Sequence, residues 1–205
     1  DFCLSRGLGD VYKRQDLGRE EEALAALEQV IQLAPEDADA YQEKGMILHK
    51  LRRFEGAWAA FEQVLRLDSD NVVAYYYKGN ALCHLKRYQE ACATYKEAFN
   101  RTPYYRFSRS DKHSHFYEEV RAESVHLIRS LTSNNAADYF CKGELLEDLG
   151  HSEEALVAYR KVISLDPKNV DSYRKVAKLL EDRGNDEEAL KAYSSAIRLN
   201  PGNFD

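Results

Sequence analysis

The stretch that decides the fold is YYYKGNALCHLKRYQEACATYKEAFNRTP, at Tyr75–Pro103. A second stretch of equal length reads YFCKGELLEDLGHSEEALVAYRKVISLDP and occupies Tyr139–Pro167. Each begins with a tyrosine, carries a glycine four residues later and ends on a proline. Such self-similarity at a fixed spacing indicates an array of repeated structural units.

Further columns extend this pattern along the chain with a period of 34, as in the step from Tyr41 to Tyr75. Small residues occupy one column, and large aromatic or aliphatic residues occupy another column four positions later. The first column holds Ala23, Ala57, Ala91, Ala155 and Ala189, and the second holds Leu27, Phe61, Tyr95, Tyr159 and Tyr193. An alanine lets two helices approach closely, and the large residue one turn later fills the space between units. The pattern predicts a helix–turn–helix in every unit, which buries its apolar side by stacking on its neighbours.

Turn residues predict the ends of these helices. An Asp or Asn before each apolar run is expected to cap the helix by accepting a backbone N–H, and this column holds Asp37, Asn71, Asn135, Asn169 and Asn203. Proline cannot continue a helix, and the units close at Pro35, Pro103, Pro167 and Pro201. Gly150 and Gly184 fall in mid-unit, where a left-handed residue can end the first helix.

These correlated columns resemble the tetratricopeptide repeat family over roughly Asp16–Pro103 and Asn135–Asp205. The resemblance implies an all-α fold, a right-handed α-solenoid of helix–turn–helix hairpins. In this register residues 37–70, 71–104, 135–168 and 169–202 are repeats, 16–36 is the second helix of a truncated repeat, and 203–205 starts another. The family pattern has an apolar residue where this chain has Lys44, Lys78 and Lys142. There we expect each lysine stem to cover apolar surface, with its ammonium group in water.

Residues 105–134 break the period, because the step from Ala91 to Ala155 is four residues short of two repeats. We interpret the segment as a degenerate, shortened repeat whose second helix is Glu118–Leu131; the alternative is one helix capped by Asp111 that runs to Leu131. The aromatic and arginine side chains at 104–109 are expected to fill the irregular joint rather than to bind nucleic acid. His113 and His115 point about 200° apart on a helix, so no metal site is expected there.

Composition narrows the class of protein. The 205 residues carry 29 Lys plus Arg against 35 Asp plus Glu, a formal net charge of −6, which argues against a nucleic-acid partner. No apolar run is long enough to span a membrane and no secretory signal is visible, so we expect a cytoplasmic protein with no membrane partner. The four cysteines, Cys3, Cys83, Cys92 and Cys141, form no CxxC pair and no disulfide-like spacing, which favours four reduced thiols.

The repeat register also predicts where a partner binds. By resemblance to the family, the first helix of each unit lines a concave groove that holds an extended or helical peptide. The candidate groove residues are Gln42, Met46, His49, Tyr76, Asn80, His84, Phe140, Glu144, Glu147, Arg174 and Lys178. Their charges suggest a polarised groove that sets the orientation of the partner. A clamp for the C-terminal carboxylate of chaperones is not expected, because Asn80 matches that pattern but Met46 and Glu144 do not.

Catalytic motifs are missing from the sequence. No phosphate-binding glycine loop, HExxH zinc motif or nucleophile elbow is present, so no catalysis, cofactor or metal is expected. The predicted function is a non-catalytic protein-interaction scaffold. Two alternatives stay open: repeats attached to an enzyme or sensor domain, and a structural or oligomerisation spacer.

Both ends of the chain are expected to be foreign or truncated. The segment SRGLGDVYKRQ at Ser5–Gln15 agrees codon for codon with an adapter tail of transposase-based sequencing libraries, so residues 1–15 are interpreted as an artefact. Pro201–Asp205 repeats the start of a further unit. The helix expected at Asp186–Leu199 would then expose an apolar face, and self-association or instability should follow.

Overall fold

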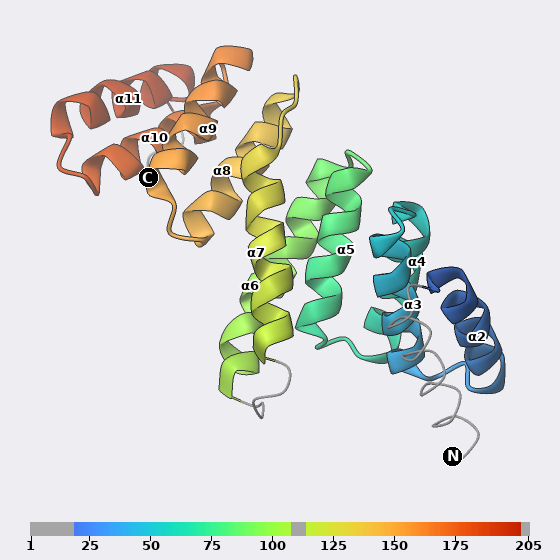
Figure 1. The fold of residues 1–205 in the computed structure, drawn as a ribbon. Helices are drawn as coiled ribbons and strands as arrows, with labels where there is room; N and C mark the ends of the chain where they lie inside the picture. Colours follow the sequence, from blue (N-terminus) through green and yellow to red (C-terminus); the bar gives the residue numbers. More distant parts are fainter. Residues whose placement is uncertain (1–18, 108–113, 202–205) are drawn as a thin grey trace. The chain divides into compact units, whose positions relative to one another are not determined.

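A computed structural model describes residues 19–107 and 114–201, and these form α-helices α2 to α11 with no strand among them (Figure 1). The chain divides into two compact units, Asp1–Val125 and His126–Asp205. The expected all-α architecture of helix–turn–helix hairpins is confirmed. None of the helices in the described ranges combines the length and the apolar character that a membrane crossing requires.

Helices pair with their neighbours in sequence within each unit. In the first unit α3 packs on α4 and α5 packs on α6, with α4 also against α5; in the second, α8 packs on α9 and α10 on α11, with α9 also against α10. The bounds are α2 Glu20–Leu33, α3 Ala38–Lys50, α4 Phe54–Leu67, α5 Val72–His84, α6 Tyr88–Phe107, α7 Ser114–Ser130, α8 Ala136–Asp148, α9 Ser152–Leu165, α10 Val170–Glu181 and α11 Asp186–Leu199.

The predicted capping residues begin the first helix of each described pair. The Asp37 carboxylate accepts from the Ala40 N–H at 3.1 Å, and the Asn71 side chain accepts from the Ala74 N–H at 3.0 Å. Asn135 and Asn169 cap α8 and α10 in the same way, while Asn203 lies outside the described residues. These side chains satisfy N–H groups that have no partner within the helix.

Left-handed residues join the two helices of each pair. Gly150 and Gly184 have φ angles of 78° and 73°, as predicted. The equivalent turns of the first unit place Arg52 and Lys86 at φ 60°. A side chain with a Cβ disfavours this conformation, so these two turns carry strain that a glycine avoids.

A glycine on the first helix of a pair faces an aromatic ring on the second. A Cβ added to Gly45 would lie 2.8 Å from the Phe61 ring, and one added to Gly143 would lie 2.6 Å from the Tyr159 ring. Gly79 meets Tyr95 in the same way. The glycine column is therefore explained by close approach of the ring to the helix backbone.

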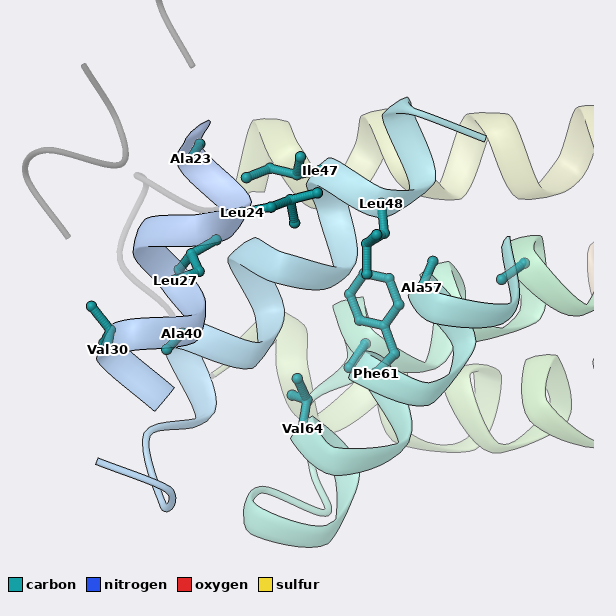
Figure 2. Close-up of a cluster of buried hydrophobic side chains, with 12 residues drawn as sticks. Ala23, Leu24, Leu27, Val30, Ala40, Ile47, Leu48, Ala57, Phe61 and Val64 are labelled. Carbon is teal, nitrogen blue, oxygen red and sulfur yellow. The ribbon is translucent and has the colours of Figure 1, made fainter. Parts of the chain in front are cut away.

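Buried side chains of α2, α3 and α4 form one continuous cluster, which Figure 2 shows in close-up. Phe61 is fully buried at its centre, with Leu48 of α3 nearby. On the α2 side, Leu24 and Leu27 pack toward Ile47. The alanine and aromatic columns thus form the core that the period predicts.

The ammonium groups of the lysines before the glycines also meet acceptors of the protein, in addition to the solvent that the sequence predicts. Lys44 Nζ lies 3.3 Å from Glu28, and Lys78 Nζ lies 2.5 Å from Glu62, each on the preceding helix. Lys142 Nζ donates to the carbonyl oxygens of Arg129 at 2.6 Å and Leu131 at 3.0 Å. Acceptors within reach replace part of the water, and at Lys142 they are the free carbonyls at the end of α7.

The prediction that Pro103 closes a unit is wrong, because α6 continues through it and ends at Phe107. A proline inside a helix removes one hydrogen bond, which is unfavourable but not forbidden. The other prolines are followed two residues later by an Asp or Asn that can cap a new helix, but Pro103 is followed there by Tyr105. Tyr105 therefore offers no cap at which a new helix could begin. The described part of the irregular middle holds the end of α6 and one helix, α7; Asp111 lies outside it.

The expectation of four reduced thiols is also wrong. Cys92 and Cys141 are each disulfide-bonded, whereas Cys83 is a free, buried thiol. Disulfide formation depends on the distance between Cα atoms in the fold, which sequence spacing does not reveal. Cys3 lies outside the described residues.

Candidate functional site

Four of the predicted groove residues line one pocket of the second unit. Phe140 and Glu144 come from α8, and Arg174 and Lys178 come from α10 (Figure 1). The pocket has a volume of about 520 Å³ and is completed by Asp171, Lys175 and Tyr193. We call this site the α8–α10 groove. It lies between the first helices of two successive pairs, as the repeat register requires.

The charges of the α8–α10 groove are unevenly neutralised. Lys175 Nζ donates to the Glu147 carboxylate at 2.9 Å, and Arg174 lies 3.9 Å from Asp171. Lys178 is exposed and makes no side-chain hydrogen bond or ion pair within the described part of the chain. The groove therefore presents Lys178 to solvent as an exposed cation, whose charge also helps to lower the pKa of Glu147.

Glu147 lies beside this groove, where its neighbours hold it in place. Its Oε2 accepts hydrogen bonds from the Tyr159 hydroxyl and from Lys175, both at 2.9 Å. Burial alone would raise the pKa of Glu147, but these hydrogen bonds outweigh it and the pKa is lowered. Glu147 is thus an ionised positioning residue for Lys175 and does not line the pocket itself.

Phe140 provides the apolar part of the groove. Its ring stands edge-on to Tyr159, with centroids 5.5 Å apart, and it is half-buried. Tyr193 lines the same pocket, and its hydroxyl donates to Glu181 at 2.9 Å. The two aromatic residues supply apolar contact beside the cations, a combination suited to an amphipathic ligand.

The prediction of an accessible groove is wrong for Tyr76 and Asn80 in the first unit, because both are fully buried. Asn80 Oδ1 accepts from the Tyr95 hydroxyl at 2.7 Å and from the Ser124 hydroxyl at 2.6 Å. Ser124 belongs to α7, the helix whose position the sequence period did not predict. Ser124 thus makes Asn80 part of the core, while Tyr76 packs against Tyr95 and Phe99 of α6.

Gln42 and Met46 occupy the first-unit groove positions on α3, where both are partly buried. The Gln42 side-chain oxygen accepts from Asn71 Nδ2 at 3.1 Å. Met46 packs against the cluster of Figure 2. Both residues therefore contribute to packing and hydrogen bonding within the first unit.

His49 and His84, the remaining predicted groove residues, lie side by side with ring centroids 5.8 Å apart. Glu123 of α7 joins them. The sequence did not predict this cluster, because its three residues are far apart in the chain and metal ligands were expected at close sequence spacing. The two histidines are one period plus one residue apart, and that spacing places them on adjacent first helices.

Comparisons with known proteins agree with this architecture. Three family models, each described as Tetratricopeptide repeat, match residues 16–78, 73–102 and 142–204. Residues 1–15 lie outside these matches and outside the described residues, so their adapter origin stays a prediction. A comparison with curated proteins finds no match.

Among solved structures, the chain is similar to "MamA 41-end from Desulfovibrio magneticus RS-1", with 17% identity and a TM-score of 0.50 over 98% of this chain and 97% of that chain. It is also similar to "MamA RS-1 ArsTM double mutant", with 18% identity and a TM-score of 0.50 over 97% of this chain and 94% of that chain. Similarity at this level of identity concerns the fold alone.

Proposed function

Because the chain belongs to the tetratricopeptide repeat family, we propose that it is a non-catalytic interaction module that binds a partner peptide in the α8–α10 groove. The observation that supports this site is the pocket between the first helices of two successive repeats. Membership of the family implies that this side of the array holds a peptide. The partner is a protein segment, extended or helical.

Charge in the α8–α10 groove favours an acidic peptide. Lys178 is an exposed cation of the groove, and Arg174 lies 3.9 Å from Asp171. A carboxylate of the partner would pair with Lys178, since an exposed cation gains by such contact without losing an existing ion pair. An apolar side chain of the same peptide would contact Phe140 and Tyr193.

The test is selection of peptides from a random displayed library on the full chain. We expect the selected peptides to combine an Asp or Glu with an aromatic or aliphatic residue. In fluorescence titrations, Lys178→Glu should weaken their binding at least about tenfold, equivalent to about 1.4 kcal/mol. Phe140→Ala should weaken it as well.

The matched control is Lys191→Glu, which makes the same charge change on the exposed surface of α11, outside the pocket. Its affinity for the selected peptides should equal that of the unmodified chain. Equal loss in both variants would mean that net charge alone governs binding. Unchanged affinity in Lys178→Glu would place the peptide elsewhere.

Self-association is a second candidate function, favoured by apolar side chains on α11. Leu190 is 65% exposed and Ile197 is 47% exposed, and a separation of seven residues puts them on one face of the helix. Two copies joined through this face would remove both side chains from water. In sedimentation at about 100 μM we expect a dimer, which Leu190→Glu together with Ile197→Glu dissociates. A monomer at all concentrations would exclude this candidate, and Val157→Glu, on exposed surface of α9, is the control.

A further inference from the structure

Two histidines and a glutamate from three helices of the first unit meet at one point. His49 of α3, His84 of α5 and Glu123 of α7 each offer one ligand atom, and these atoms lie within 4.8 Å of one another. His49 Nε2 is 3.7 Å from the Glu123 carboxylate. We propose that the first unit binds one divalent transition-metal cation, such as Zn²⁺, through these three residues.

His49 Nε2 is a buried nitrogen without a hydrogen-bond partner in the part of the chain that the structure describes. Buried polar atoms are nearly always satisfied, and one left alone is unfavourable. A cation at this point would take the lone pair of that nitrogen. The His49 side chain is 12% exposed and Glu123 is 40% exposed, so a cation can enter from the Glu123 side.

Aromatic neighbours restrict both imidazole rings. Phe54 stacks on His84, with centroids 4.0 Å apart and an interplanar angle of 10°. Phe54 and Tyr77 each meet His49 edge-on at 5.5 Å. Rings held in this way lose little freedom when they bind a metal, which favours affinity.

The donor set selects the class of cation. Two imidazole nitrogens and one carboxylate oxygen suit zinc and other late first-row metals, whereas Mg²⁺ and Ca²⁺ prefer oxygen ligands alone. Ligand atoms around a tetrahedral Zn²⁺ are about 3.4 Å apart at normal bond lengths. The separation of His49 and Glu123 is already close to this value, and rotation of the partly exposed Glu123 shortens the remaining distances.

The charges around the proposed site suit a divalent cation: the two imidazoles can bind it as neutral ligands, and the carboxylate of Glu123 offsets part of its charge. Burial lowers the pKa of His49, and burial together with the neighbouring His49 lowers the pKa of His84. An imidazole in its neutral form has a lone pair to offer to a cation. Glu123 supplies negative charge, while Arg52 is the nearby cation that opposes binding.

The experiment titrates the chelator-treated full chain with Zn²⁺ by calorimetry and with Co²⁺ by visible absorption. We expect one Zn²⁺ per chain and a Co²⁺ spectrum without a thiolate band. The variants His49→Gln, His84→Gln and Glu123→Gln should each weaken Zn²⁺ binding at least about tenfold. Circular dichroism without metal checks that each variant is folded. If the histidine variants do not fold, the Zn²⁺ affinity of Glu123→Gln, a change at a partly exposed position, tests the proposal.

The control is His151→Gln, which removes a histidine that lies 4.0 Å from Glu154 in the second unit. It should leave Zn²⁺ affinity unchanged. Three results would overturn the proposal: no saturable binding up to about 100 μM, unchanged affinity in Glu123→Gln, or a thiolate band. The last would assign the metal to Cys83, whose pKa burial raises to about 11.

Discussion

At the groove position of the first unit, Asn80 is fully buried and accepts a hydrogen bond from Ser124. At the equivalent position of the second unit, two periods less four residues later, Glu144 lines an open pocket. The same contrast separates buried Tyr76 from half-buried Phe140. The repeat register fixes which side of a helix a residue occupies, and the next packed element decides whether that side is accessible.

The aromatic column shows the same contrast in its hydrogen bonds. Tyr95 is enclosed and donates to Asn80, whose oxygen also accepts from Ser124. Tyr159 donates instead to Glu147, a partly buried carboxylate beside the α8–α10 groove. A ring whose hydroxyl belongs to a fully buried network is expected to adapt less than a ring whose hydroxyl bonds a carboxylate near the surface.

Replacing the ring-facing glycines should give the largest difference in stability loss between the two units. Gly79→Ala would drive a Cβ into the Tyr95 ring, and we expect a loss of about 3 kcal/mol because that ring cannot shift. Gly143→Ala should cost about 1–2 kcal/mol, since its Cβ would lie slightly farther from the ring and the Tyr159 hydroxyl bonds a partly buried carboxylate. Urea unfolding measures both.

Gly56→Ala is the control for these variants, because its Cβ would meet only the Leu48 side chain, at 3.2 Å. It should leave stability unchanged or raise it slightly through better helix propensity. Equal losses in Gly79→Ala and Gly143→Ala would contradict the difference that we draw between the units.

Removing the tyrosine hydroxyls should produce the next largest effects. Tyr95→Phe breaks a fully buried hydrogen bond and should cost about 1–2 kcal/mol. Tyr193→Phe breaks an exposed bond to Glu181 and should have no measurable effect. Thermal unfolding gives the ranking, with Tyr159→Phe expected between the other two; a reversed order would refute it.

Smaller effects are expected at the turns within the pairs. Lys86→Gly relieves a positive φ in the first unit and should stabilise it by about 0.5–1 kcal/mol. Gly150→Ala introduces the same strain into the second unit and should cost about 1 kcal/mol. Both are read from urea midpoints, and a destabilised Lys86→Gly would show that the turn is held by its side chain instead.

The two units should also lose stability at different pH. The histidines of the first unit have a pKa lowered by burial from 6.5, so below about pH 6.5 the unfolded chain binds more protons and stability falls. The lowered pKa of Glu147 contributes stability in the second unit that is lost only as pH falls below 4.5.

Trp58, the single tryptophan, lies on α4 and reports the first unit. With a chelator present, the urea midpoint that Trp58 fluorescence reports should be lower at about pH 5.5 than at about pH 7. Circular dichroism also reports the second unit, and the part of its urea transition that belongs to this unit should keep the same midpoint at both pH values. The double variant His49→Gln and His84→Gln should abolish the shift. If the urea midpoint still shifts in this variant, titrating groups other than these two histidines cause the shift.

Much of the fold was predictable because its signals are local. Asp37 and Asn71 cap their helices through hydrogen bonds to backbone three residues away, so the sequence window contains both partners. The Gly79–Tyr95 contact lies within one repeat and shares the regularity of the period. Four residues that the same register assigns to a groove, Phe140, Glu144, Arg174 and Lys178, line one pocket of the second unit.

The parts that could not be predicted depend on α7. This segment lacks the glycine, the proline and the regular spacing, so nothing in the sequence positioned Ser124 over Asn80 or Glu123 beside His49. The disulfide state of Cys92 depends equally on a distance in space. Contacts between a regular repeat and an irregular helix can be identified only from the three-dimensional structure.

Lys142 has a consequence for how this array tolerates mutation. Its equivalents Lys44 and Lys78 depend on a glutamate, and a single substitution there removes the contact. Lys142 binds main-chain oxygens of residues 129 and 131 instead, and every residue type provides such an oxygen. Lys142 therefore stabilises the end of α7 through a contact that is independent of which side chains residues 129 and 131 carry.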